Sequence, residues 1–213
     1  KVNQPETSIA KALDDEEWDY ISFQQVSSSS GIYDSYVTPL PLLFEYVKKR
    51  AMNKDVKYIL HQTWAYSKDS NHKLYGNYEN DQMIMFSGIV DAIERAKYLV
   101  PIDIVVPAGT AIQNGRTSFL GDTFCRDGCH LERKYGRYTA ACAWFERIFG
   151  INVIGNSYKP EVLSDQEVDI AQQAAHYAVE NPTKITDLTH FKNQTRVAQL
   201  FNQFDCYRIV YGF

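Results

Sequence analysis

Residues 102–109, with the sequence IDIVVPAG, carry the clearest fold signal in the chain. β-Branched residues dominate positions 102–106, and a short apolar run of this kind is typical of a strand that is covered on both faces. A proline and a glycine then end the run. The stretch therefore predicts a strand of a parallel sheet, with strand-and-helix units on either side of it.

Two more strands are expected upstream, at Trp18–Val26 and Val56–Trp64, because both runs are rich in good β formers. Apolar residues at helical spacing predict helices at Thr7–Glu17 and Pro39–Met52, and Asn80 is placed to cap a helix that runs to about Val100.

Downstream, residues 111–114 look like one helical turn, and Gly136–Phe149 reads as a helix with one apolar face. Ser164 and Glu167 form a capping box for a helix that ends near Glu180. Residues 208–211 are a weaker candidate for a last strand. The strand-helix alternation predicts an α/β fold with a mainly parallel sheet and helices on both faces.

Length and composition limit the classes of protein to which this chain can belong. The 213 residues, 45% of them hydrophobic, fit one domain over 1–213. The net charge is −4 and the basic residues are dispersed, so we expect no nucleic-acid partner. No apolar run approaches the ~20 residues that span a bilayer. Any export signal would precede Lys1, so the compartment stays open.

The cysteines at positions 125, 129, 142 and 206 do not form a disulfide-rich pattern. Cys125 and Cys129 could pair, or could bind a metal together with His130. Their C-x3-C spacing has no second cysteine pair or histidine pair nearby, so small buried thiols and no metal are expected.

Polar residues follow each predicted strand, at the sheet edge where ligands bind in open α/β folds. Gln24 and Gln25 precede a serine run at 27–30, and His61–Trp64 end the second strand. The candidate pocket residues at this rim are Gln62, Trp64, Thr110 and Asn114. The alternatives are a structural histidine at His61, a core role for Trp64 and a flexible serine connection.

A D-x-x-H motif lies in Arg126–Leu131, where Asp127 precedes His130 by three residues. At this spacing the carboxylate can hold one imidazole nitrogen while the other nitrogen acts as a general base. The alternative interpretation is a turn at Asp127 and Gly128, with His130 capping the following helix.

The linked motifs WDYISFQQVSSSSG, YILHQTWAY, DIVVPAGTAIQN, RDGCHL and GRYTAACAWFE resemble the SGNH-hydrolase-like proteins of gut Bacteroidetes, the domain-of-unknown-function 4886 group. The resemblance covers about Ile9 to Val179. It implies a three-layer α/β/α sandwich of SGNH or flavodoxin-like type, and it assigns Asp127 and His130 to a Ser-His-Asp triad. By the same resemblance, the Gln25 amide would help to form the oxyanion hole, with Gln24 less favoured. No cofactor is implied.

The nucleophilic serine of that superfamily follows its first strand, and nothing before Thr7 matches that block. We therefore expect the chain to lack an N-terminal strand and to receive its serine from outside this sequence. The resulting hypothesis is a serine ester hydrolase that removes acyl or acetyl groups from a carbohydrate or another small ester. The alternative is a non-catalytic carbohydrate-binding module, motivated by aromatic residues near the rim: Tyr33, Tyr36, Trp64, Tyr66, Tyr75 and Tyr78.

Overall fold

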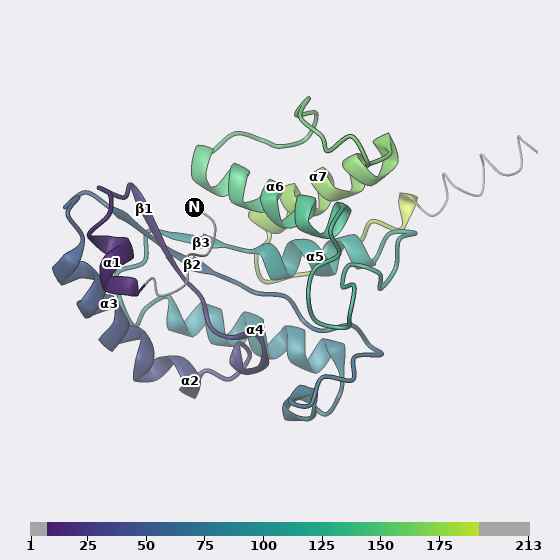
Figure 1. Ribbon diagram of the computed structural model, residues 1–213. Coiled ribbons are helices and arrows are strands. Elements are labelled where there is room, and N and C mark those ends of the chain that lie inside the picture. The colour runs from purple at the N-terminus through teal and green to yellow at the C-terminus, as the bar shows by residue number, and fades with distance from the viewer. Residues whose placement is uncertain (1–7, 192–213) are drawn as a thin grey trace, which may run out of the picture.

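The structure, a computed structural model, describes residues 8–191. Helices and strands alternate along this part of the chain (Figure 1). In chain order they are α1 (Ile9–Leu13), β1 (Tyr20–Phe23), the 3-10 helix η1 (Ser27–Ser29), α2 (Asp34–Val37), α3 (Pro39–Arg50), β2 (Lys57–His61), the 3-10 helix η2 (Tyr75–Tyr78), α4 (Gln82–Ala96), β3 (Ile104–Val106), α5 (Ala108–Arg116), α6 (Tyr135–Phe149) and α7 (Asp165–Glu180).

The three strands form a parallel sheet in the order β1-β2-β3, as the strand-helix alternation predicts. Tyr20 lies opposite Lys57, and Ile59 lies opposite Ile104. Because all three strands run in the same direction, their carboxyl ends meet at one edge of the sheet. The residues that follow β1, β2 and β3 therefore share a rim.

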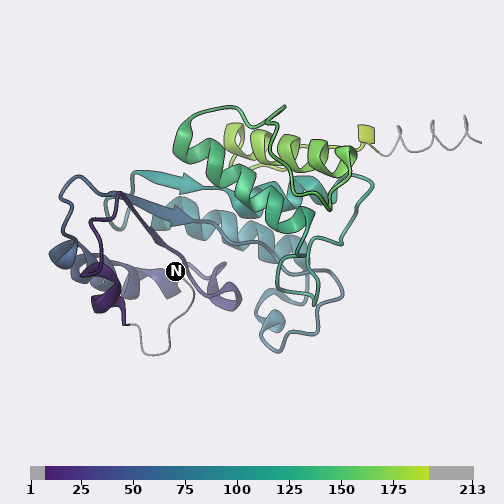
Figure 2. The ribbon, with the colours of Figure 1, turned by 45° about the horizontal axis from the view of Figure 1, so that its top comes forward.

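The central strand β2 is covered on both of its faces. Tyr58 and Leu60 join a hydrophobic cluster with α3 and α4, whereas Ile59 joins a second cluster with α6 and α7. Figure 2 shows α4 on one side of the strands and α6 and α7 on the other. Ile59 and Leu60 are fully buried, and burying each such side chain stabilises the fold by about 1.5–3 kcal/mol.

His61 ends β2 as a buried, hydrogen-bonded residue, in line with the structural alternative for this histidine. Its ring stacks on Trp144 of α6 with 5.4 Å between the ring centroids, and Trp144 Nε1 donates to His61 Nδ1 over 3.1 Å. Burial lowers the pKa of His61 to about 4, because the charged imidazolium would lose its hydration.

Several predicted boundaries need correction. Asp81, not Asn80, caps α4, accepting from the backbone N–H groups of Met83 and Ile84, while Asn80 adopts a left-handed φ of 55°. The single turn expected at 111–114 is the larger helix α5, since Pro107 and small residues allow it to begin directly after β3. The capping box of Ser164 and Glu167 is confirmed.

The three strands are shorter than the runs of strand-forming residues suggested, and α1 ends at Leu13. The candidate strand at 208–211 lies outside the described residues.

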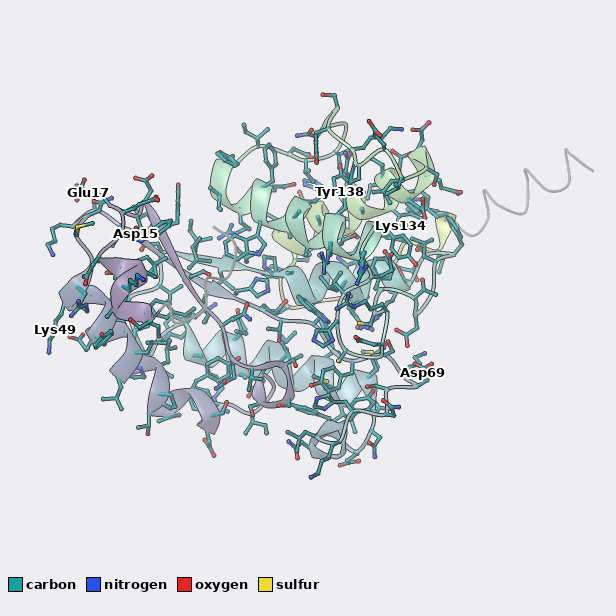
Figure 3. The ribbon with its side chains drawn as sticks, viewed as in Figure 1. Asp15, Glu17, Lys49, Asp69, Lys134 and Tyr138 are labelled. Carbon is teal, nitrogen blue, oxygen red and sulfur yellow. The ribbon has the colours of Figure 1, made fainter. Side chains whose placement is uncertain are left out.

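The edge of β1 that faces away from β2 has no strand partner within residues 8–191. Beside it lies an apolar groove of about 320 Å³, lined in part by Ile9, Leu13 and Tyr20. Tyr20 is 41% exposed and Ile9 is 53% exposed. The sheet therefore presents an open, apolar edge on this side. Charged side chains such as Asp15, Glu17 and Lys49 surround the same end of the molecule (Figure 3).

Among the helices of residues 8–191, none has both the length and the apolar character needed to cross a bilayer.

The close approach of α5 to the end of β2 leads to a first prediction. A Cβ added at Gly109 would lie well inside contact distance of Thr63 O and 2.9 Å from Thr63 C. Because backbone atoms cannot swing aside, Gly109→Ala should destabilise the protein by about 2 kcal/mol or more. Gly76→Ala is the control, since a Cβ there meets nothing within 4 Å. Urea unfolding of both variants provides the measurement, and equal midpoints would contradict the packing described.

His61 leads to a second prediction, on the pH dependence of stability. The folded-state pKa of about 4 lies below the ordinary value of 6.5, so the unfolded chain binds a proton first as the pH falls. The stability associated with the neutral ring should be complete above pH 6.5 and should decline by about 3 kcal/mol as the pH falls to 4. His61→Asn keeps an acceptor for Trp144 and should flatten this part of the curve. Identical slopes in the two proteins, measured by denaturant unfolding between these pH values, would argue against a buried neutral His61.

Candidate functional site

The D-x-x-H motif occupies the tip of a short closed loop. Cys125 and Leu131 form an isolated antiparallel bridge across its base. Arg126 N donates to His130 O over 2.9 Å, so the two arms of the loop are joined next to the tip. Gly128 has a φ of 82°, a left-handed conformation that residues with a side chain rarely adopt. The loop backbone therefore brings residues 127–130 together.

Within this tip, Asp127 holds His130 by both its backbone and its ring. Asp127 Oδ1 accepts from His130 N over 2.7 Å, and Asp127 Oδ2 lies 2.9 Å from His130 Nδ1. The backbone N–H of His130, followed by its ring, holds the pKa of Asp127 well below its ordinary range. A carboxylate that stays ionised fixes Nδ1 as the protonated nitrogen and leaves Nε2 as the basic one. The His130 side chain is 66% exposed, so solvent and ligands can reach it.

The loop is anchored to the chain that follows β2. Trp64 Nε1 donates to Cys129 O over 2.8 Å, and Ser67 N donates to Gly128 O over 2.9 Å. Trp64, a predicted pocket residue, is thus brought next to the D-x-x-H motif. Its indole is half-buried and acts here as a support for the loop.

A largely buried ion pair, for which residue spacing offers no signal, supports this region. Arg116 at the end of α5 lies 2.8 Å from Asp122 through Nε, and its guanidinium also donates to Ala65 O. Asp122 in turn accepts from Lys68 N and from the side chain of Gln82. One carboxylate therefore joins α4, α5 and the segment after β2.

The structure places Gln25 at the carboxyl end of β1, on the predicted rim. Its amide Nε2 donates to Ser35 O over 2.9 Å and lies 3.1 Å from Ser35 Oγ, while Oε1 accepts from Val26 N. The amide is thus held in a defined orientation by the backbone and by Ser35. Binding an oxyanion would require one N–H to exchange its bond to Ser35.

The other predicted pocket residues, Gln62, Thr110 and Asn114, are buried and bonded inside the protein. Gln62 Oε1 accepts from Thr110 N over 2.8 Å, joining the end of β2 to the start of α5. Asn114 donates to Ala174 O in α7 and accepts from Thr186 N. These polar side chains connect elements of the fold, and their role in binding a substrate stays a prediction.

The aromatic rim suggested for carbohydrate binding is not an exposed surface. Tyr36, Tyr66, Tyr75 and Tyr78 are each at most 4% exposed, so their faces cannot stack on a sugar. Tyr36 and Tyr78 instead donate from their hydroxyl groups to the backbone of the serine segment, at Ser30 O and Ser28 O. The expectation was wrong for these residues because their rings form the core beneath the rim.

The expectation that Cys125 and Cys129 are small buried thiols fails, because both are partly exposed, whereas Cys142 is buried and Cys206 lies outside the described residues. Cys129 Sγ lies 3.4 Å from Asp127 Oδ1 and 3.3 Å from His130 Nδ1. Asp127, Cys129 and His130 together form a group of potential metal ligands within 4.8 Å of one another. The ligand set considered from the sequence contains Cys125 in place of Asp127, and the sequence analysis expects no metal there.

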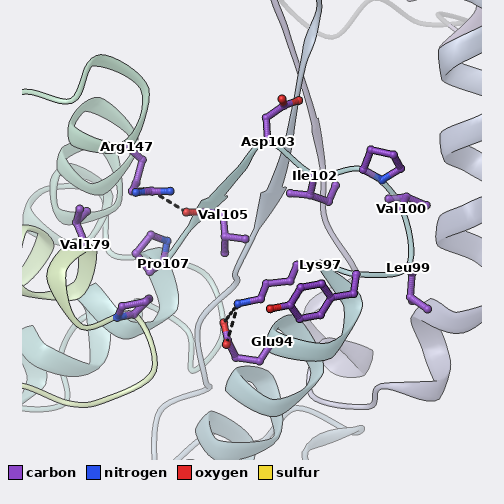
Figure 4. Close-up of a pocket in the computed structure, with 13 residues that line it drawn as sticks. Glu94, Lys97, Leu99, Val100, Ile102, Asp103, Val105, Pro107, Arg147 and Val179 are labelled. Atoms are coloured by element: carbon purple, nitrogen blue, oxygen red, sulfur yellow. Dashed lines mark hydrogen bonds and ion pairs between the residues drawn. The ribbon is translucent and has the colours of Figure 1, made fainter.

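A cavity of about 630 Å³ lies away from this loop, along the open edge of β3 (Figure 4). Its charged residues are already bonded, since Lys97 pairs with Glu94 at 2.9 Å and Arg147 donates to Val105 O over 3.0 Å. These charged groups thus hold contacts within the fold, and the candidate site is the Asp127–His130 loop.

Comparison with known proteins agrees with this placement of the elements. None of the curated proteins matches the chain. Among solved structures, the chain is similar to a DUF4886 family protein from Bacteroides uniformis ATCC 8492, whose crystal structure has a resolution of 1.50 Å. The two are 51% identical with a TM-score of 0.82, and the match covers 85% of this chain and 70% of the other.

Residues 1–178 match the family described as Domain of unknown function (DUF4886). The match spans most of the chain, and the chain therefore belongs to the DUF4886 family.

Proposed function

We propose that the protein is a serine ester hydrolase of the SGNH type, acting on acyl or acetyl esters of a carbohydrate. The single observation that carries the proposal is the Asp127–His130 pair, in which an ionised carboxylate lies 2.9 Å from Nδ1 of an exposed imidazole. This is the arrangement that a general base needs in a Ser-His-Asp triad. The three-layer sandwich of SGNH hydrolases belongs to the same proposal.

The chemistry assigns a role to each group. A serine hydroxyl attacks the ester carbonyl while His130 Nε2 removes its proton, and the same nitrogen then returns that proton to the departing alcohol. Asp127 holds the ring through Nδ1 and stabilises the imidazolium. A water molecule then attacks the acyl-enzyme with His130 as its general base, and the acid is released. No metal or organic cofactor takes part.

The serine is proposed to come from a segment outside these 213 residues. The open edge of β1 supports this, since within residues 8–191 it combines an unpaired strand edge with an apolar groove lined in part by Ile9, Leu13 and Tyr20. A parallel strand added there would end at the same rim as β1, β2 and β3. Its carboxyl end would place a serine on the rim that carries Gln25 and the D-x-x-H loop.

The first test is labelling of the natively produced protein with a serine-directed fluorophosphonate, followed by intact-mass and peptide analysis. We expect a mass above 24.5 kDa and a label on one serine outside this sequence. An unlabelled protein would overturn the hydrolase proposal and would favour the non-catalytic binding module.

His130→Ala in the natively produced protein should abolish acetyl-ester cleavage by removing the base, while the fold is retained because the side chain is exposed. The expected loss in kcat is on the order of 10³-fold or more. His190→Ala is the matched control, since this histidine is also exposed and lies beyond α7. Substantial turnover by His130→Ala, with p-nitrophenyl acetate as the substrate, would exclude the assigned role.

Gln25→Ala should lower kcat by about 10²–10³-fold with little change in KM, because its amide acts on the oxyanion that develops in the transition state. Gln24→Ala provides the neighbouring control at the same rim. If both variants lose activity equally, or if only KM changes, Gln25 is not the oxyanion donor.

A further inference from the structure

Three chemically different ligand atoms converge at the tip of the D-x-x-H loop. Cys129 Sγ lies 3.3 Å from His130 Nδ1 and 3.4 Å from Asp127 Oδ1. His130 Nδ1 lies 2.9 Å from Asp127 Oδ2. A carboxylate, a thiol and an imidazole thus face one another over a span no larger than 4.8 Å.

These separations are close to the edges of a tetrahedral metal site. With Zn–S about 2.3 Å and Zn–N or Zn–O about 2.0–2.2 Å, neighbouring ligands lie about 3.3–3.6 Å apart. The observed separations of 2.9–3.4 Å are a few tenths of an ångström shorter. The triangle must therefore open by only a few tenths of an ångström when an ion binds.

The backbone of the loop is already held in place. Gly128 provides the left-handed turn between Asp127 and Cys129. Trp64 and Ser67 fix the carbonyl groups of Cys129 and Gly128, as described above. A prearranged loop reduces the ordering cost of binding. The partial exposure of all three side chains gives an ion direct access and leaves room for a water as the fourth ligand.

We propose that Asp127, Cys129 and His130 form a binding site for one thiophilic divalent cation, with zinc(II) as the expected ion. The ligands are an Asp127 carboxylate oxygen, Cys129 Sγ and His130 Nδ1. Thiolate and imidazole ligands favour zinc over magnesium or calcium, which prefer oxygen. On binding, Cys129 releases its thiol proton to solvent as the Zn–S bond forms, and the ring proton of His130 moves from Nδ1 to Nε2, which frees the Nδ1 lone pair for the ion. The ion must compete with Arg126, whose Nε lies 3.6 Å from Asp127 Oδ2.

The site overlaps the proposed catalytic pair. A cation on His130 Nδ1 takes the place of Asp127 as the partner of that nitrogen, and the ring proton then lies on Nε2, which can no longer accept a proton from a serine. If the proposed function is correct, binding of the cation inhibits ester hydrolysis. Only this consequence rests on the proposed function. The cation is therefore a regulator of the site and not a cofactor of the reaction.

The test is a titration of the natively produced, fully reduced protein with cobalt(II) as a spectroscopic substitute for zinc. We expect thiolate-to-cobalt charge-transfer absorption at one equivalent, and we expect zinc to displace the cobalt and remove the band. Neither measurement depends on hydrolytic activity. The result can therefore be interpreted even if the protein is not a hydrolase.

Matched thiol variants locate the site. Cys129→Ser should abolish the charge-transfer band and weaken zinc binding at least tenfold, whereas Cys125→Ala should retain both, because Cys125 is not among the grouped ligands. His130→Ala should also weaken binding at least tenfold. No charge-transfer band in the unmodified protein, or unchanged zinc affinity in Cys129→Ser, would overturn the proposal. Circular dichroism of each variant confirms that the fold is intact.

Discussion

The parallel pairing of β2 with a strand on each side is the constraint on which the rest of the structure depends. β2 is hydrogen-bonded to β1 and β3, and its alternate side chains enter two hydrophobic clusters on opposite faces. A strand with no free edge and no free face has little freedom in register, because a shift by one residue would exchange the two sets of side chains. The fixed end of β2 then positions the chain segment that directly follows this strand.

Two contacts at the end of β2 fix the position of the elements that support the candidate site. Gly109 lets α5 approach the backbone of Thr63, and the Gln62 side chain accepts from Thr110 at the start of the same helix. The chain then leaves β2 through Trp64 and Ser67, which hold the backbone of the D-x-x-H loop. An exposed loop is thus connected, through a few hydrogen bonds, to the most buried strand in the described part of the chain. This connection explains how surface side chains can keep a defined geometry.

The candidate site combines a rigid backbone with accessible side chains. Asp127 uses both oxygen atoms on the residues immediately after it, so the pair with His130 is built within one turn of chain. Cys129 lies between them and adds a soft ligand to what is otherwise a carboxylate-imidazole pair. The two proposed uses of this loop, proton transfer at His130 Nε2 and metal binding at His130 Nδ1, therefore compete for one imidazole ring.

The sequence by itself determined the three strands, most of the longer helices and some of the local geometry, because the interactions responsible join residues close together in the chain. The parallel α/β arrangement follows from alternating strand and helix patterns. The capping box at Ser164 and the Asp127–His130 contact follow from a spacing of three residues.

Only the tertiary structure decided which polar side chains are buried. Gln62 and Asn114 are hydrogen-bonded to α5, α7 and the segment beyond α7, and Arg116 forms an ion pair with Asp122. The four buried tyrosines form part of the core for the same reason. Contacts between residues distant in the chain depend on how the elements pack, and that packing cannot be deduced from residue spacing.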